Sequence, residues 1–318
     1  MRSGQNPAKF IDDVARPEKV TVVVVTYLPF LAGYFAEGLE VLHVCLNSVR
    51  RNTDTPFDLM VFDNGSAPEV VADLLEARAR GEIDYLLLSR KNLGKGGAWD
   101  IALAGAPGEI LAYADGDVYF HPGWLPSAMR LLDTFPKVGM VSSRPMRTDP
   151  ALFGSTLRWA DSDAEVQVER GQFIPWETVR EHDVNLGQPE ADVRRRYEQT
   201  EDVRLRYGGA EALVGAVHWQ FIGRKDVLRQ FLPLSLERPM GQVRTLDARL
   251  DAVGYLRLMT PEARVRHMGN TVPPDLKAAS GSMARPRRSA PSWLLRWGPV
   301  RRLLLGVHNQ IFRWYFRS

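Results

Sequence analysis

Two aspartates, Asp115 and Asp117, stand one residue apart directly after the apolar run 110–112 and Tyr113-Ala114. Carboxylates this close repel each other unless a cation lies between them. A divalent metal ion bound to a diphosphate would supply that cation, because hard cations prefer carboxylate and phosphate oxygens. A solvated turn is the alternative interpretation, so the surrounding elements have to decide between the two.

Residues 18–145 alternate between strand-like and helix-like segments, which is typical of a mostly parallel sheet with helices on both faces. The run 20–26 is β-branched throughout, as expected of a strand buried on both faces. Further strands are predicted at 57–63, 83–88, 109–114 and 138–142, and helices at about 35–51, 68–80, 94–104 and 122–135.

Polar residues follow each of the first four predicted strands. Because such sheets bind ligands at the carboxyl ends of their strands, we expect these residues to converge on one edge. They are Thr26 and Tyr27, then Asp63 to Ser66, then Arg90 to Asn92, and finally Asp115 to Asp117. Four clusters in register favour a ligand site over unrelated surface loops.

The second half of the chain is less regular. Residues 146–210 are rich in Arg, Asp and Glu, and we predict only a solvated helix near 194–198. An ordered apolar segment is predicted at 212–217, a helix at 243–253, and two closing strands at 255–258 and 263–266. The segment 278–291, rich in Ala, Ser, Arg and Pro, is typical of a linker.

The composition is that of a soluble globular protein, with 45% hydrophobic and 25% charged residues among 318. The single cysteine, Cys45, excludes an internal disulfide and a cysteine metal cluster. Residues 1–19 show no signal peptide, and no apolar run reaches the roughly 20 residues that span a bilayer. We therefore expect a cytoplasmic protein.

Residues 276–318 carry nine Lys or Arg and no acidic residue, which leaves 32 basic and 38 acidic residues elsewhere. Their apolar residues recur at helical spacing and predict a basic amphipathic helix at 292–318. This helix would lie on an anionic membrane, on the inner face, or else pack on the catalytic domain or form a homodimer seam. We expect no nucleic-acid partner. The apolar residues are Trp293, Trp297, Val300, Leu304, Val307, Ile311 and Trp314.

Taken together, these motifs resemble the GT-A fold glycosyltransferases, family 2 in particular, over about residues 18–270. The resemblance implies an α/β, Rossmann-like, three-layer fold with a mostly parallel central sheet. It implies one GT-A domain with a nucleotide-sugar half at 18–145 and an acceptor half at 146–275, between an extension at 1–17 and a linker at 276–291. The matching motifs are Val25-Thr26-Tyr27, Asp63-Asn64-Gly65-Ser66, Asn92-Leu93-Gly94, Ala114-Asp115-Gly116-Asp117 and Val265-Arg266-His267-Met268-Gly269-Asn270.

The family resemblance further implies transfer of a sugar from a nucleoside-diphosphate sugar, with a UDP-sugar as the default, to a hydroxyl of a cell-envelope or lipid-linked glycan. Asp117 and His267 would bind Mn²⁺ or Mg²⁺, and Asp115 would contact the ribose and the metal. The remaining assignments are Asp63 to the nucleobase, Thr26 and Tyr27 to the base pocket, Asn92, Lys95, Gly96 and Gly116 to nucleotide or sugar, and Trp219 and Gln220 to the acceptor.

Several of these residues have simpler alternatives. His267 could be a hydrogen-bonded histidine at a strand end, and Asp63 could form only an Asx turn. Lys95 could be a surface lysine, Tyr27 ordinary packing, and Trp219 a core residue.

Inverting transfer needs a general base, which takes the proton of the acceptor hydroxyl. Relatives usually supply it from an acidic pair at the start of a late helix, and no such pair stands between Gly241 and Gly254. We choose Asp247 as the base, with Glu237 as the alternative. Asp247 could instead be an ordinary carboxylate on the surface of a helix. Because the usual acidic pair is missing, a retaining mechanism stays open.

Other function classes fit less well. A nucleotidyltransferase would carry a Gly-rich, Arg-containing loop after the first strand, where Thr26-Tyr27-Leu28-Pro29-Phe30 stands instead. A catalytically inactive binding module is disfavoured by Asp115, Asp117 and His267. A dinucleotide dehydrogenase is disfavoured because no Gly-x-Gly-x-x-Gly follows the first strand.

Overall fold

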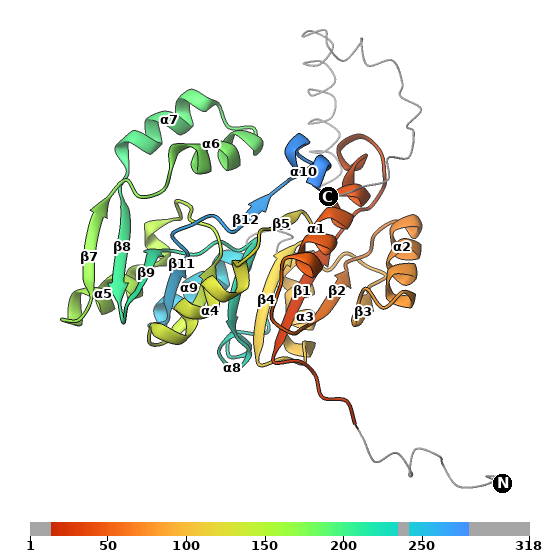
Figure 1. Ribbon diagram of the computed structural model, residues 1–318, viewed down its shortest axis with the longest axis horizontal. Helices are drawn as coiled ribbons and strands as arrows, with labels where there is room; N and C mark the ends of the chain where they lie inside the picture. Colours follow the sequence, from red (N-terminus) through yellow and green to blue (C-terminus); the bar gives the residue numbers. More distant parts are fainter. Residues whose placement is uncertain (1–13, 235–241, 280–318) are drawn as a thin grey trace, which may run out of the picture. The chain divides into compact units, whose positions relative to one another are not determined.

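The computed structural model describes residues 14–234 and 242–279. Its main feature is a ten-stranded sheet with the order β3-β2-β1-β4-β10-β6-β11-β9-β8-β7, and β12 and β5 form a second sheet of two strands (Figure 1). The strands are β1 (Val20–Thr26), β2 (Phe57–Asp63), β3 (Tyr85–Leu88), β4 (Ile110–Asp115), β5 (Val118–Phe120), β6 (Val138–Ser142), β7 (Gln167–Gly171), β8 (Asp202–Tyr207), β9 (Ala210–Val214), β10 (Gln220–Arg224), β11 (Leu256–Met259) and β12 (Val265–His267).

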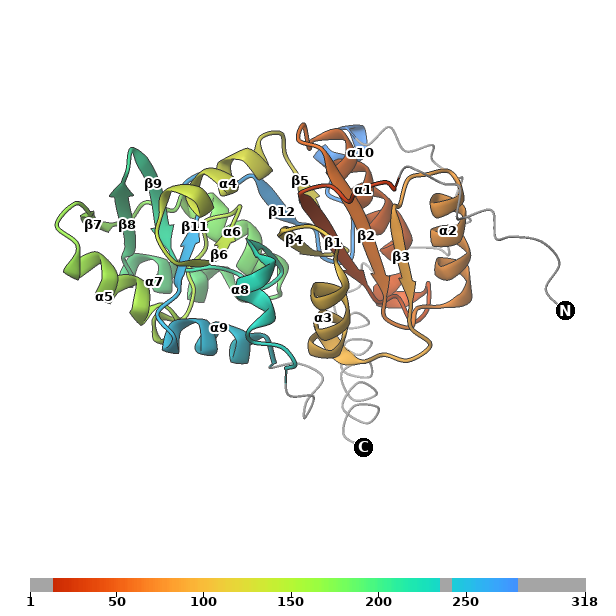
Figure 2. The same cartoon turned by 90° about the horizontal axis from the view of Figure 1, so that it is seen from below.

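Helices cover both faces of the large sheet (Figure 2). Helices α1, α2 and α4 pack on one face, and α3, α8 and α9 pack on the other. The helices are η2 (Gly33–Phe35), α1 (Gly38–Arg51), α2 (Pro68–Ala79), α3 (Gly94–Gly105), α4 (Trp124–Thr134), η3 (Pro150–Leu152), α5 (Gly154–Ser162), α6 (Trp176–Asn185), α7 (Glu190–Gln199), α8 (Lys225–Arg229), α9 (Gln242–Ala252) and α10 (Pro274–Ala279).

Strand β1 shows why its sequence is β-branched without interruption. Side chains alternate between the two faces of a strand, so Val22 and Val24 join the core under α1 while Val23 joins the core under α3. All three are fully buried, and each contributes roughly 1.5–3 kcal/mol through burial. A polar residue at any of these positions would be buried in an apolar layer.

The register of the parallel strands places their carboxyl ends at one level. Thr26 of β1 lies opposite Asp63 of β2, and Val25 lies opposite Asp115 of β4. This confirms that the polar residues after these strands share one edge of the sheet.

Beyond β4 the sheet becomes mixed. Strand β10 runs antiparallel between β4 and β6, and β9, β8 and β7 alternate in direction after β11. Most strands still share one direction, as predicted, because only β10, β9 and β7 run against the rest.

The expectation of little regular structure at 146–210 is wrong. This segment forms β7, β8, α5, α6 and α7, of which only α7 matches the predicted helix. Strand β8 alternates buried Val203 and Leu205 with Arg204 and Arg206, which pair with Glu169 of β7. The high charge of these strands concealed their period of two.

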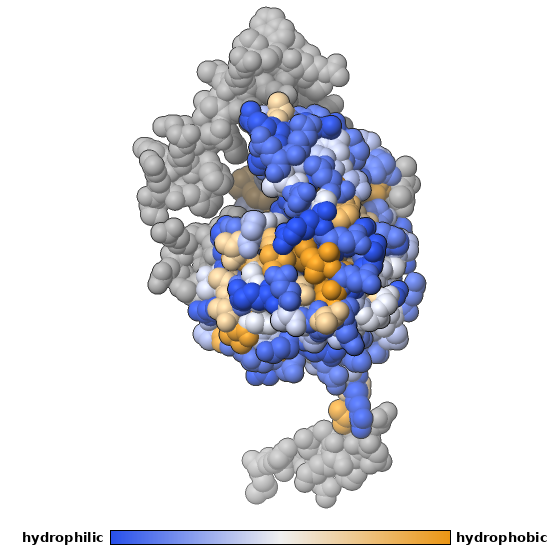
Figure 3. All heavy atoms as spheres, turned by 90° about the vertical axis from the view of Figure 1, so that its left-hand side faces the viewer, coloured by the Kyte–Doolittle hydropathy of each residue, from blue (hydrophilic) through white to orange (hydrophobic). Residues whose placement is uncertain are grey.

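The charged pairs lie at the end of the sheet, on the β7 side. The surface seen from this side is mostly hydrophilic and carries an apolar patch near its centre (Figure 3). Charge on an edge strand disfavours pairing with another chain.

Two further expectations meet the boundaries of the described residues. The predicted linker begins at 276, yet residues up to Ala279 belong to α10. The rest of that linker and the predicted helix at 292–318 lie outside the described residues, as do 1–13 of the predicted extension. Within the described part of the chain, no helix is long and apolar enough to cross a membrane.

Candidate active site

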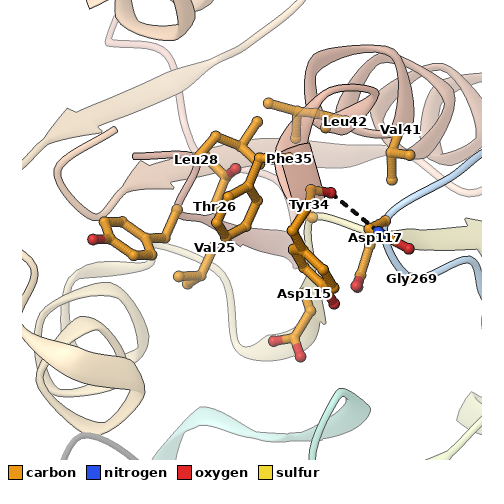
Figure 4. Close-up of a pocket in the computed structure, with 14 residues that line it drawn as sticks. Val25, Thr26, Leu28, Tyr34, Phe35, Val41, Leu42, Asp115, Asp117 and Gly269 are labelled. Carbon is orange, nitrogen blue, oxygen red and sulfur yellow. Dashed lines mark hydrogen bonds between the residues drawn. The ribbon is translucent and has the colours of Figure 1, made fainter. Parts of the chain in front are cut away.

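A pocket of about 190 Å³ opens at the carboxyl edge of the parallel strands (Figure 4). Its walls come from the end of β1 and the loop after it, from α1, from the β4–β5 turn and from the turn after β12. The Asn270 side chain donates to the carbonyl oxygen of Tyr34 at 3.1 Å. This bond connects the turn after β12 to the loop after β1. The predicted site residues that line this pocket are Thr26, Tyr27, Asp115, Gly116 and Asp117.

Both carboxylate oxygens of Asp115 have partners. Lys95, in the first turn of α3, donates from Nζ to Oδ2 at 2.7 Å, and the Tyr113 hydroxyl donates to Oδ1. The Lys95 ammonium also lies 5.5 Å from the centre of the Tyr113 ring and 5.6 Å from that of the Trp99 ring. The Lys95 side chain is 20% exposed, so the interpretation of a plain surface lysine is wrong.

Asp117 faces His267 beside the two-stranded sheet. Strands β5 and β12 pair antiparallel with His267 opposite Val118, which brings the end of β12 to the β4–β5 turn. The Nε2 atom of His267 lies 3.3 Å from Oδ2 of Asp117, and the backbone N–H of Met268 donates to the Asp117 carbonyl at 2.8 Å. Burial raises the pKa of the Asp117 carboxyl, and the positive charge of a protonated His267 opposes this rise.

The surroundings of Asp117 fit a divalent cation that is shared with a phosphate ligand. Its Oδ1 atom is buried and has no hydrogen-bond partner among the described residues. In the same part of the chain, no three His, Cys, Asp or Glu side chains form a metal-binding group. Mg²⁺ is commonly held by one or two protein ligands together with substrate phosphates. Asp117 and His267 could therefore hold such an ion once a diphosphate supplied further oxygens.

Gly116 separates the two aspartates where the chain passes close to β1. Its backbone N–H donates to the Val25 carbonyl at 3.0 Å. A Cβ atom at this position would lie 3.2 Å from Leu42 Cδ1 and 3.3 Å from Thr26 Cβ. The small residue therefore lets the turn sit directly against β1.

Asp63 ends β2 and is fully buried. Its carboxylate accepts from the backbone N–H groups of Gly65 at 3.3 Å and Ser66 at 3.2 Å, which is an Asx turn. Asp63 does not line the pocket, and its predicted contact with a nucleobase stays a prediction.

Asn92 serves the loop that precedes α3. Its Oδ1 atom accepts from the Asn64 side chain at 3.1 Å and from the Gly94 N–H at 2.8 Å. These bonds fix the start of α3, where Lys95 and the buried Gly96 lie, against the end of β2. A helix start attracts anions. The Lys95 ammonium and the backbone N–H groups at the start of α3 therefore both favour an anion on the Asp115 side.

Trp219 and Gln220 lie next to the end of β4, and the Asp115 N–H donates to the Trp219 carbonyl at 2.9 Å. Both side chains are buried, and Trp219 Nε1 and Gln220 Nε2 lack hydrogen-bond partners among the described residues. The Trp219 ring meets the His267 ring edge-on at 5.5 Å and stacks at 6.0 Å on His182 of α6. Trp219 is thus a buried residue that also borders the Asp117–His267 pair.

Asp247, on α9, is 3% exposed, so the helix-surface interpretation is wrong. Its Oδ1 forms an ion pair with Nη2 of Arg257 at 3.0 Å. The Arg257 guanidinium donates from Nη1 to the Leu152 carbonyl and from Nη2 to the Ala216 carbonyl. Burial raises the pKa of Asp247 to about 6, against the opposing effect of Arg257. Asp247 does not line the pocket. Glu237 lies outside the described residues.

Three aromatic side chains beside the site were not predicted. Tyr34 and Phe35, both in η2, line the pocket together with the aspartates (Figure 4). Burial and the charge of Asp117 raise the pKa of the Tyr34 hydroxyl. The density of aromatic residues after the first strand could have signalled these two. The third is His182. No local sequence pattern predicts its place, because it comes to the site only through the packing of α6.

Comparison with known proteins gives a family match. Residues 21–181, about half of the chain, match the family described as glycosyl transferase family 2. A search of curated proteins found no match.

Among solved structures, the chain is similar to the mannosyltransferase PcManGT from Pyrobaculum calidifontis in complex with GDP-Man and Mn²⁺, at 17% identity and a TM-score of 0.47. It is also similar to S. aureus TarS 1-349 in complex with UDP, at 15% identity and a TM-score of 0.45. Each match covers 78% of this chain, which spans 56% and 60% of the length of those two chains.

Proposed function

Because the chain belongs to glycosyl transferase family 2, we propose that it transfers a sugar from a nucleoside-diphosphate sugar to an acceptor hydroxyl with inversion. The predictions of family 2 and of an α/β fold with a mostly parallel central sheet are confirmed. The nucleotidyltransferase and inactive-module interpretations have no support from this family. The observation that carries the proposal is that Asp115 and Asp117 both line the pocket at the strand ends.

The leaving diphosphate gains negative charge in the transition state. A bound Mn²⁺ or Mg²⁺ ion would offset that charge as a Lewis acid. Asp117 and His267 would hold this ion, since they lie together and Asp117 Oδ1 has an unused lone pair in a buried setting. Asp115 would contact the ribose, and Lys95 with the start of α3 would face the phosphates.

The nucleoside would enter between β1 and the loop that carries Tyr34. Thr26 and Tyr27 line this part of the pocket, and Asp63 would read the nucleobase. A UDP-sugar is the proposed default donor. The acceptor is proposed to be a cell-envelope or lipid-linked glycan that approaches on the side of Trp219 and Gln220.

Asp247 is the proposed general base. A pKa of about 6 would leave it mostly ionised at neutral pH and basic enough to accept a proton. Its contact with Arg257 would have to loosen when the acceptor binds, because an ion-paired carboxylate is a weaker base.

A peripheral membrane location is proposed for the full chain. The supporting observation is the charge of residues 276–318, with nine basic and no acidic residues. Removing 294–318 should release the protein from vesicles of anionic lipid in a flotation assay, whereas vesicles of neutral lipid should bind neither form. Full-length protein that never binds anionic vesicles would contradict this location.

A thermal-shift experiment tests the catalytic proposal. UDP, GDP and CDP, alone and with Mn²⁺, are each added to the wild-type protein and to Asp117→Asn. One nucleotide should raise the melting temperature of the wild type only when Mn²⁺ is present, because ligands of the native state stabilise it. The absence of Mn²⁺-dependent stabilisation with every nucleotide would overturn the proposal.

A further inference from the structure

Lys95 occupies a position at Asp115 where a bound metal ion would compete with it for the carboxylate. Its ammonium group contacts Asp115 Oδ2 at 2.7 Å, and the other oxygen of that carboxylate accepts from Tyr113. Each carboxylate oxygen of Asp115 therefore already accepts one hydrogen bond, whereas Asp117 Oδ1 accepts none from the described residues. A divalent ion on Asp115 would lie close to the Lys95 ammonium, and the two positive charges would repel each other. Metal binding at Asp115 therefore favours displacement of Lys95.

Tyr113 is the donor that cannot leave easily. Its side chain is 1% exposed, stacks on Phe221 at 5.1 Å and meets Trp99 edge-on at 5.0 Å. Lys95 is partly exposed and carries its charge on a flexible four-carbon stem. Its position in the first turn of α3 also lies close to backbone N–H groups that attract phosphate.

We propose that Lys95 is an exchangeable counterion of the donor site. It neutralises Asp115 while the site is empty, and it moves to the diphosphate of the donor when a divalent ion contacts Asp115. This inference rests on the proposed function and adds a positioning residue to it.

The exchange predicts effects of opposite sign on two ligands. Without nucleotide, Lys95 competes with the metal ion for Asp115, so its removal should strengthen metal binding. With nucleotide, Lys95 contributes an attraction for the diphosphate, so its removal should weaken nucleotide binding. A lysine with a purely structural role would weaken both.

Calorimetry on the full chain can measure both effects. The variant Lys95→Met keeps most of the apolar stem against Trp99 and Tyr113 and removes the charge. The matched control is Lys19→Met, at an exposed position just before β1 and at the opposite end of that strand from the site. We expect Lys95→Met to bind Mn²⁺ alone about tenfold more tightly, and the nucleoside diphosphate of the thermal-shift screen in saturating Mn²⁺ about tenfold less tightly. Lys19→Met should change either constant by less than about twofold, as is usual for an exposed, screened charge.

The outcomes separate this inference from the proposed function. If the wild type binds Mn²⁺ with nucleotide but Lys95→Met shows unchanged or weaker binding of Mn²⁺ alone, the exchange is wrong and the function stands. If the wild type binds no nucleotide with Mn²⁺, both fail. Should Lys95→Met not fold, Lys95→Gln replaces it, and the same two shifts of opposite sign are required.

Discussion

The Nε2 atom of His267 lies 3.3 Å from Oδ2 of Asp117, at the meeting point of β12 with the turn before β5. In Asp117→Asn the carboxylate is lost while the shape is kept, so we expect sugar transfer to fall by a factor on the order of a hundred or more. The melting temperature should stay equal or rise, because burial disfavours the Asp117 charge. Turnover and thermal unfolding measure the two effects.

The matched control for this variant is Asp133→Asn. Asp133 lies on α4 and pairs with Arg224 at the surface, so its loss should leave turnover unchanged. Equal turnover in Asp117→Asn and Asp133→Asn would refute the metal assignment.

Asp247 and Arg257 form a buried pair whose members should be strongly coupled. If Asp247 is the base, Asp247→Asn should reduce turnover and spare nucleotide binding. It should also lower the free energy of unfolding by about 3 kcal/mol, because Arg257 is left buried without its counter-charge. Denaturant unfolding and nucleotide calorimetry give the two quantities.

The double variant Asp247→Leu, Arg257→Met separates stability from catalysis. It should recover most of the lost free energy of unfolding, since no isolated charge remains, yet stay inactive. Recovery of activity together with stability would assign Asp247 a structural role only.

His218 should make stability sensitive to mild acid. Burial, followed by the positive charge of Lys95, lowers the pKa of His218 to about 4. A lowered folded-state pKa means that the unfolded state binds more protons between about pH 6.5 and 4. The free energy of unfolding should therefore fall by up to about 3 kcal/mol as the pH drops through this window, where the shift is converted at about 1.4 kcal/mol per pKa unit.

The variant His218→Asn tests this pH dependence. Denaturant unfolding at several pH values should show a shallower loss of stability below pH 6.5 than in the wild type. If the free energy of unfolding falls equally with pH in the wild type and the variant, groups other than His218 cause the acid sensitivity.

Gly65 should be needed both for its backbone angle and for the space it leaves. Its φ is +88°, and a Cβ atom would lie 3.0 Å from backbone atoms of Lys91 and Asn92. Gly81 has φ +75° with no atom within 4 Å of such a Cβ. Gly81→Ala should cost about 1 kcal/mol of unfolding free energy through strain, and Gly65→Ala more, about 2–3 kcal/mol. Only Gly65→Ala should weaken nucleotide binding, and equal losses in both variants would show that the close approach is unimportant.

Local patterns were sufficient for the first half of the fold. The β-branched run of β1 and the apolar runs of β2, β4 and β6 can be buried only as central strands, and their polar ends then share one edge. The strands β7 and β8 were missed because Glu169, Arg204 and Arg206 mask the alternation, and their stability depends on partners in another strand. Strand β5 was missed because its three residues pair only with distant β12.

The sequence by itself therefore determined the family, the GT-A sheet and the polar edge that carries Asp115 and Asp117, since these depend on neighbours along the chain. Tertiary structure alone decided which partners those carboxylates have. Lys95 reaches Asp115 from α3, and His267 reaches Asp117 from β12. Such pairs depend on how helices and strands pack, which no local pattern records. The same reason explains why Asp247 turned out to be buried against Arg257 although its helix was predicted.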